Sequence, residues 1–217
     1  MSEAIIAREL ERAASYRFLS LLFVPPSAEV GAELRALAPT VHPALSEDAA
    51  LAGERTDRSL EGLYHRVLGP SGQVPDTECA YDDNGGVGRG VLIGDVAGFY
   101  AAFAYAPAAP GTADHIASEL GFLGWLAMKL AYAHHAGLPE QVEITESARA
   151  AFLRDHAGRW MLPFLERLAA VADGTHYEAL ATLAARSLRA LEGEKAFARP
   201  RARLPLVTDE PDELECG

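Results

Sequence analysis

Apolar residues recur at spacings of three and four along most of the chain, which is the pattern of amphipathic α-helices. The first such segment covers residues 6–22 and ends before Pro25-Pro26, and the second covers residues 28–38 and ends before Pro39. Runs in which apolar and polar residues alternate, as in half-buried strands, are almost absent. The pattern predicts an all-α fold, a single-domain helical bundle of seven or eight helices.

The next part of the chain predicts one helix followed by a long connection. Ser46 is typical of a helix N-cap, and the helix that it opens is predicted to continue to Leu68 and to end at Gly69-Pro70. Residues 70–90 are rich in glycine and proline and predict an irregular connection. Connections of that length in compact domains are usually functional or disordered.

A central helix with an unusual beginning is predicted in the second half of the chain. Thr112 is a plausible N-cap, and the helix is predicted to end near Gly137. Its first turn would carry an acid and an imidazole, Asp114 and His115. Glu119 is the one other acid in this segment, which is otherwise apolar on almost every face. Titratable residues at the N-terminus of a buried helix need an explanation, which is either helix capping or recognition of a partner.

Two further helical regions complete the predicted bundle. Thr145 is predicted to start the first of them, and Gly158 and Pro163 are predicted to divide it into two pieces. The last helix is predicted to end at about Leu191. Residues 192–217 are polar, contain prolines and become acidic, so they predict a flexible tail after an all-helical domain of residues 1–191.

Composition and charge restrict the class of protein. The chain has 217 residues, 49% of them hydrophobic, and a formal net charge of −12, which suits one globular domain and argues against a nucleic-acid partner. Cys79 and Cys216 form no CxxC or zinc pattern, which favours a reducing compartment. The longest apolar stretch, residues 120–133, is interrupted by Lys129 and is too short to span a bilayer. We expect a cytoplasmic protein without stable membrane insertion.

The Asp114-His115 pair is the most informative candidate for chemistry. An acid near a helix N-terminus is stabilised by the helix dipole by about 0.3–1 kcal/mol, but a protonated histidine there is disfavoured. Glu119 follows His115 by one helical turn, on the same face. The three residues are compatible with a functional site and also with a satisfied structural network, and the spacing does not decide between them.

Catalytic and cofactor sites find little support in the sequence. His115 and Glu119 have the spacing of two metal ligands, but a third ligand from His65, His156 or His176 would fall in no HExxH-like arrangement. The glycine run at 85–90 has neither the spacing nor the neighbours of a phosphate-binding loop. No Ser or Cys lies in a nucleophile pattern. We expect no catalytic residue, no metal and no cofactor.

Several segments, in this order and spacing, together resemble the TorD/DmsD family of redox-enzyme maturation chaperones. The resemblance covers roughly Arg12 to Leu191. The segments that carry it are Leu21-Leu22-Phe23-Val24-Pro25, Leu63-Tyr64-His65-Arg66-Val67-Leu68-Gly69-Pro70, the loop with Pro75, Glu78 and Tyr81, Ile93-Gly94-Asp95, Phe99-Tyr100, Asp114-His115-Ile116 with Glu119-Leu120 and Phe122-Leu123, and Phe152, His156, Trp160 and Phe164.

The resemblance implies an all-helical cytoplasmic chaperone and not an enzyme. Such proteins bind the apo catalytic subunit of a dimethyl-sulfoxide-reductase-type molybdoenzyme. Many members also bind the subunit's N-terminal twin-arginine signal peptide and delay export until the molybdenum cofactor is inserted. We expect a monomer or a domain-swapped dimer, with residues 105–112 as the hinge.

By the same resemblance, partner and signal-peptide binding is expected at seven residues, with the Asp114-His115 pair at the rim of an apolar groove: Tyr64, Leu68, Glu78, Tyr81, Asp114, His115 and Glu119. Carboxylates beside an apolar groove suit a peptide with two guanidinium groups and an apolar stretch. The alternatives are a chaperone of the nitrate-reductase branch with a non-exported client, and a nucleotide- or metal-dependent helical enzyme. A generic helical scaffold in which the Asp-His pair is only structural is a further alternative.

Overall fold

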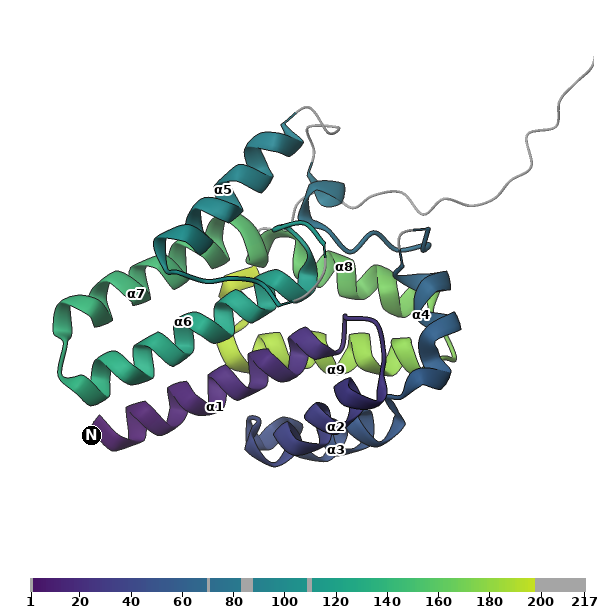
Figure 1. Cartoon of the computed structure of the whole chain (residues 1–217), viewed down its shortest axis with the longest axis horizontal. Coiled ribbons are helices and arrows are strands. Elements are labelled where there is room, and N and C mark those ends of the chain that lie inside the picture. Colours follow the sequence, from purple (N-terminus) through teal and green to yellow (C-terminus); the bar gives the residue numbers. More distant parts are fainter. Residues whose placement is uncertain (1, 70, 83–87, 109–110, 198–217) are drawn as a thin grey trace, which may run out of the picture.

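Two long helices, α1 (Ser2–Leu21) and α6 (Ile116–Ala136), lie antiparallel at the centre of the computed structural model, which describes residues 2–69, 71–82, 88–108 and 111–197 (Figure 1). Gly124 allows their close approach, because a Cβ atom at this position would lie 3.2 Å from Cβ of Tyr16 and 3.3 Å from the carbonyl oxygen of Ala13. The pair is the axis on which the other helices pack.

The remaining helices surround this pair. They are α2 (Ala28–Leu37), α3 (Ser46–Arg55), α4 (Glu61–Val67), α5 (Arg89–Ala102), α7 (Pro139–Phe152), α8 (Gly158–Val171) and α9 (His176–Glu192). A π-helical turn, η5 (Leu153–Ala157), joins α7 to α8 end to end, so the described residues form eight helical rods. This confirms the predicted all-α fold; the described residues contain no strand.

The structure corrects the helix predicted from Ser46 to Leu68. The α3 helix ends at Arg55, Thr56 is extended, and the side chain of Asp57 accepts a hydrogen bond from the backbone N–H of Ser59 (2.7 Å). This Asx cap starts a new turn that leads into α4. The expected N-cap is also wrong, because the hydroxyl of Ser46 donates to the carbonyl oxygen of Pro43.

The helical region after α6 begins earlier than predicted. Pro139 occupies the first turn of α7, where its missing N–H is not needed, and Thr145 lies inside the helix with its hydroxyl bonded to the Gln141 carbonyl. The predicted break at Gly158 is not found, because helical structure continues through the π turn η5 into α8, which begins there. The division at Pro163 is wrong, because Pro163 lies within α8 without ending it.

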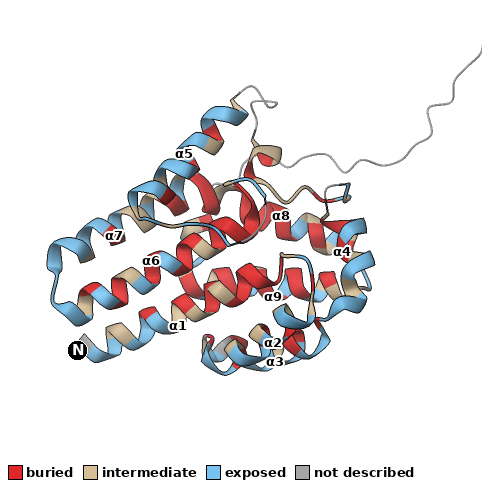
Figure 2. Cartoon of the chain, in the orientation of Figure 1, coloured by how far each residue is buried: buried red, intermediate tan, exposed pale blue. Residues whose placement is uncertain are grey.

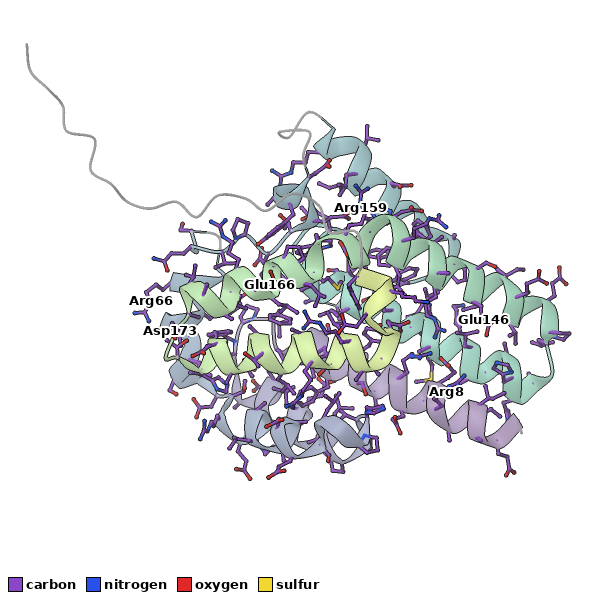
Figure 3. The ribbon with its side chains drawn as sticks, turned by 180° about the vertical axis from the view of Figure 1, so that it is seen from behind. Arg8, Arg66, Glu146, Arg159, Glu166 and Asp173 are labelled. Atoms are coloured by element: carbon purple, nitrogen blue, oxygen red, sulfur yellow. The ribbon has the colours of Figure 1, made fainter. Side chains whose placement is uncertain are left out.

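The hydrophobic core lies where α1, α6, α8 and α9 face one another, and buried residues follow the inner faces of these helices (Figure 2). Seen from behind, α8 and α9 lie side by side (Figure 3). The outer surface of α5 is mostly exposed, and this helix leans away from the body (Figures 1 and 2). Among the described residues, no helix is both long and apolar enough to cross a membrane.

The first residues of the expected tail pack on the body. Glu194–Phe197 form a short helical turn, η6, and the Phe197 side chain is buried in the core. Gly158 permits this packing, because a Cβ atom there would lie 2.3 Å from the carbonyl oxygen of Ala196. The rest of the expected flexible tail, residues 198–217, lies outside the described residues.

Candidate functional site

A short antiparallel pairing joins the long connection to the start of α6. The backbone N–H of Glu78 donates to the carbonyl oxygen of Asp114 (2.8 Å), and that of Ile116 donates to the carbonyl oxygen of Asp76 (2.9 Å). Thr77 and His115 form the bridge between these two bonds. The pairing fixes the loop that carries Glu78 directly against the Asp114-His115 pair.

His115 is the N-cap of α6. Its Nδ1 atom accepts a hydrogen bond from the backbone N–H of Ala117 (3.1 Å), so the helix begins at Ile116 and not in a turn opened by Thr112. Because Nδ1 accepts, the ring proton is assigned to Nε2, which lies 3.3 Å from a carboxylate oxygen of Asp76. The expected cap at Thr112 is therefore wrong, and the Asp-His pair precedes the helix.

Asp114 holds the loop in place from inside the protein. Its side chain is fully buried and accepts hydrogen bonds from the backbone N–H of Cys79 (3.1 Å) and from the hydroxyl of Thr112 (2.5 Å). Burial raises the pKa of the Cys79 thiol, and the nearby Asp114 carboxyl adds to the effect. The Asp114 carboxyl group is thus hydrogen-bonded at the junction of loop and helix.

Glu119 and Glu78 form a buried pair of carboxyl groups, both fully inaccessible to solvent. Glu119 accepts a hydrogen bond from the indole N–H of Trp160 (3.0 Å). Burial raises the pKa of Glu119 well above its ordinary value of 4.5, and the charge of Glu78 and a hydrogen bond with it raise the pKa further. Burial beside Glu78 thus favours the protonated form of Glu119 in the folded protein.

His156 links this pair to the surface. Its Nδ1 atom lies 3.0 Å from a carboxylate oxygen of Glu78, and its Nε2 atom lies 3.2 Å from a carboxylate oxygen of Asp95. His156 is itself buried, whereas 65% of the Asp95 side chain is exposed. The π turn η5 carries His156 and α5 carries Asp95, so this contact attaches α5 to the body.

The structure brings together five of the seven predicted residues. Glu78, Asp114, His115 and Glu119 lie around the pairing described above, and Tyr81 packs on Trp160 with ring centroids 5.5 Å apart. Tyr64 and Leu68 lie apart, where α4 ends. The ring of Tyr64 packs against Tyr177. Burial raises the pKa of Tyr64 to about 12, and the charge of Asp76 contributes to this shift, so the effect of Asp76 on Tyr64 is electrostatic.

Asp114 and His115, which were expected at the rim of a groove, are buried instead. All seven side chains belong to buried residues, and the most exposed of them, His115, is 8% exposed. The cause is the packing of the 71–82 connection and α5 over the start of α6, which helical periodicity does not report. The binding role of the seven residues stays a prediction.

Four residues of the cluster were absent from the predicted site: Asp76, Asp95, His156 and Trp160. His156 and Trp160 had a usable signal, because they lie four residues apart between Phe152 and Phe164 in the predicted helical region. Asp76 and Asp95 gave none, since acids in a connection and on an outer helix face are ordinary. Among the described residues no three His, Cys, Asp or Glu side chains are arranged to hold a metal ion.

The comparison with known families now bears on this cluster. Residues 27–166 match the family of the nitrate reductase delta subunit, and the match includes every residue of the cluster. The chain belongs to this family. Its members are chaperones of molybdoenzyme maturation, which confirms the predicted TorD/DmsD-like relationship. A search among curated proteins finds no match to the chain.

Membership of the nitrate reductase delta subunit family gives the cluster a context. The family is one of chaperones and not of enzymes, and its members bind the catalytic subunits of molybdoenzymes. A buried group of acids in such a protein invites a binding explanation before a catalytic one. The matched region contains α2 to α7 and much of α8, which together build the cluster.

Proposed function

We propose that this chaperone holds the apo catalytic subunit of a dimethyl-sulfoxide-reductase-type molybdoenzyme until the molybdenum cofactor is inserted. In this proposal it also binds the subunit's N-terminal twin-arginine peptide at the cluster around Asp114 and Glu119. The observation that carries the peptide part is the buried Glu78–Glu119 pair, with Asp114 beside it. Burying carboxyl groups is costly, and acids with strongly shifted pKa values recur at functional sites.

The chemistry of the pair fits an arginine side chain. In the described part of the structure no lysine or arginine contacts the Glu119 carboxyl, and its raised pKa favours the protonated form. A guanidinium group could replace that proton, because it carries a charge and several donors in one plane. Peptide binding would then release a proton, and its affinity would increase with pH.

Access to the pair requires movement of the elements that cover it. The α5 helix is the better candidate, since much of its surface faces solvent. It is attached through the buried side chains of Leu92, Val96 and Tyr100 and through the His156–Asp95 contact. Elements with few buried contacts are the ones that open at low free energy. Peptide binding is therefore proposed to displace α5 from the body.

A binding experiment tests the proposal. A fluorescent twin-arginine peptide of the client would be titrated with wild type, Asp114→Asn and Glu119→Gln. We expect the dissociation constant to increase about tenfold or more in each variant, which corresponds to ~1.4 kcal/mol. Glu146→Gln is the matched control, because Glu146 is an exposed acid on α7 (Figure 3). Equal affinities in all four proteins would contradict the proposed site.

A nitrate-reductase-type enzyme is the second candidate client. The family description, which names nitrate reductase, favours it. A client of this kind need not carry a twin-arginine peptide. Pull-down of the two apo catalytic subunits, each with and without its N-terminal segment, separates the candidates: the first predicts capture that depends on the twin-arginine segment, and the second predicts capture without it.

A further inference from the structure

The ring of His156 lies between two carboxylates. Glu78 lies at 3.0 Å from Nδ1 and Asp95 at 3.2 Å from Nε2. The ring is hydrogen-bonded to one of these carboxylates, through Nδ1 and Glu78. Although Nε2 is close to Asp95, it is buried and makes no hydrogen bond in the described structure. The ring therefore fills the place between the acids without satisfying both of them.

Two aromatic rings complete the surroundings of His156. The ring of Phe99 meets the imidazole edge to face at 5.5 Å, and the ring of Phe152 lies at 5.2 Å with an interplanar angle of 36°. Aromatic faces attract planar cations, and a guanidinium group stacks on them. The place thus combines two acids with two aromatic rings, which is the environment that a desolvated cation requires.

We infer that the place of the His156 ring, between Glu78 and Asp95, is a guanidinium-binding site that an internal imidazole fills when no arginine is bound. The inference rests on the proposed function for the source of the arginine, the client peptide. A guanidinium group has five N–H donors in a fixed plane and can donate to both carboxylates at once. It would keep the contact with Glu78 and add a hydrogen bond to Asp95, to which the imidazole makes none.

The structure provides a route for the exchange. Asp95 is largely exposed, so an arginine side chain can reach the site from the surface along α5. His156 belongs to the π turn η5, which contains one residue more per turn than an α-helix. A shift of this turn towards α-helical hydrogen bonding would rotate His156 away from the site. Turns of this kind are frequent at functional sites.

Chemical rescue tests the site without any client. His156→Ala would leave a cavity lined by Glu78, Asp95 and the two rings, and we expect a lower unfolding midpoint than in wild type. Methylguanidinium, at concentrations well below denaturing ones, should restore most of the decrease in the unfolding midpoint, because a ligand that binds the folded state stabilises it. Methylammonium at equal ionic strength should restore less.

The controls decide the outcome. His156→Ala/Glu78→Gln lacks one acid and should show no rescue. Absence of rescue in His156→Ala, or equal rescue in the single and double variants, would overturn the inference. If His156→Ala does not fold, His156→Arg and His156→Met provide the test, since they have comparable size and only one supplies a guanidinium. We expect a higher unfolding midpoint for His156→Arg; an equal or lower one would also overturn the inference.

The rescue test and the peptide-binding test can give different outcomes, so the cation site and the proposed function are tested separately. Rescue by methylguanidinium together with unchanged peptide binding in Asp114→Asn and Glu119→Gln would keep the cation site and reject the peptide assignment. Loss of peptide binding in those variants without any rescue would keep the proposed function and reject this site.

Discussion

At the scale of single residues, burial decides what the acids of the cluster can do. Asp114 accepts two hydrogen bonds, whereas Glu119 accepts one from Trp160 and has its pKa raised by burial and by Glu78. Two buried carboxyl groups therefore differ in their surroundings: one is held by hydrogen bonds, and the other favours the protonated form. The difference has measurable consequences for stability and for the start of α6.

The proton on Glu119 makes stability depend on pH. Because the folded pKa of Glu119 lies well above 4.5, the folded state keeps a proton that the unfolded state loses as pH increases above 4.5. Stability therefore decreases with increasing pH in this window, by up to about 1.4 kcal/mol per pH unit. Glu119→Gln keeps an acceptor for Trp160 and does not titrate, so we expect it to be more stable than wild type, by a margin that grows with pH.

Urea denaturation from about pH 5 to about pH 8 measures this margin, within the range where carboxyl linkage applies. Glu146→Gln is again the control, and its difference from wild type should stay constant. A margin for Glu119→Gln that does not change with pH would mean that Glu119 is ionised in the folded state.

The N-cap role of His115 predicts a graded response to substitution. His115→Ala removes the acceptor for the backbone N–H of Ala117 and should cost about 1 kcal/mol of unfolding free energy. His115→Asn keeps an acceptor at the cap and loses the contact with Asp76, so its cost should be well below that of His115→Ala. Chemical denaturation measures both values, and equal losses would show that the Asp76 contact, not the cap, is what stabilises the protein.

At the scale of elements, periodicity predicted the helices well and their ends poorly. Helix ends depend on single side-chain bonds, and Ser46, Thr112 and Thr145 offered plausible caps that the structure does not use. His115 is not among the residues usually expected at an N-cap. The π turn at Leu153–Ala157 and the pairing of the 71–82 connection with the start of α6 depend on tertiary contacts, so periodicity carries no signal for either.

The close packing of α2 on the segment after α3 gives a prediction at this scale. A Cβ atom at Gly31 would lie 2.2 Å from the carbonyl oxygen of Thr56, and backbone cannot move aside as a flexible side chain can. Gly31→Ala should therefore cost about 1–3 kcal/mol. Gly62→Ala, in α4 with nothing within 4 Å, should instead stabilise by up to about 1 kcal/mol. Thermal unfolding of both variants checks the opposite signs, and a stabilising Gly31→Ala would contradict the packing.

At the scale of the whole molecule, the sequence indicated the right family, and five of the seven predicted residues lie together, but the Asp114-His115 pair is buried and not at a rim. The acids of the cluster come from the connection, from the start of α6 and from α5, and each is polar in a segment whose neighbours predict nothing about burial. These acids become buried only when their segments pack together with the π turn and α8. For this reason a rim was expected and an interior cluster is found.

The end of the folded body shows the same dependence on long-range packing and can be tested directly. Residues 1–191 were expected to form the domain, yet Phe197 is 6% exposed and belongs to the core, in a turn that packs against Gly158. Near the same end, Tyr16 of α1 donates to Glu192 (2.8 Å), so the first and last helices are joined there.

Because Phe197 is buried, Phe197→Ala should cost about 3 kcal/mol of unfolding free energy, as for other buried phenylalanines. Lys195→Ala, exposed in the same turn, should change stability by less than about 0.5 kcal/mol. Chemical denaturation of the full chain measures both, and equal small effects would place the end of the folded body at Leu191 after all.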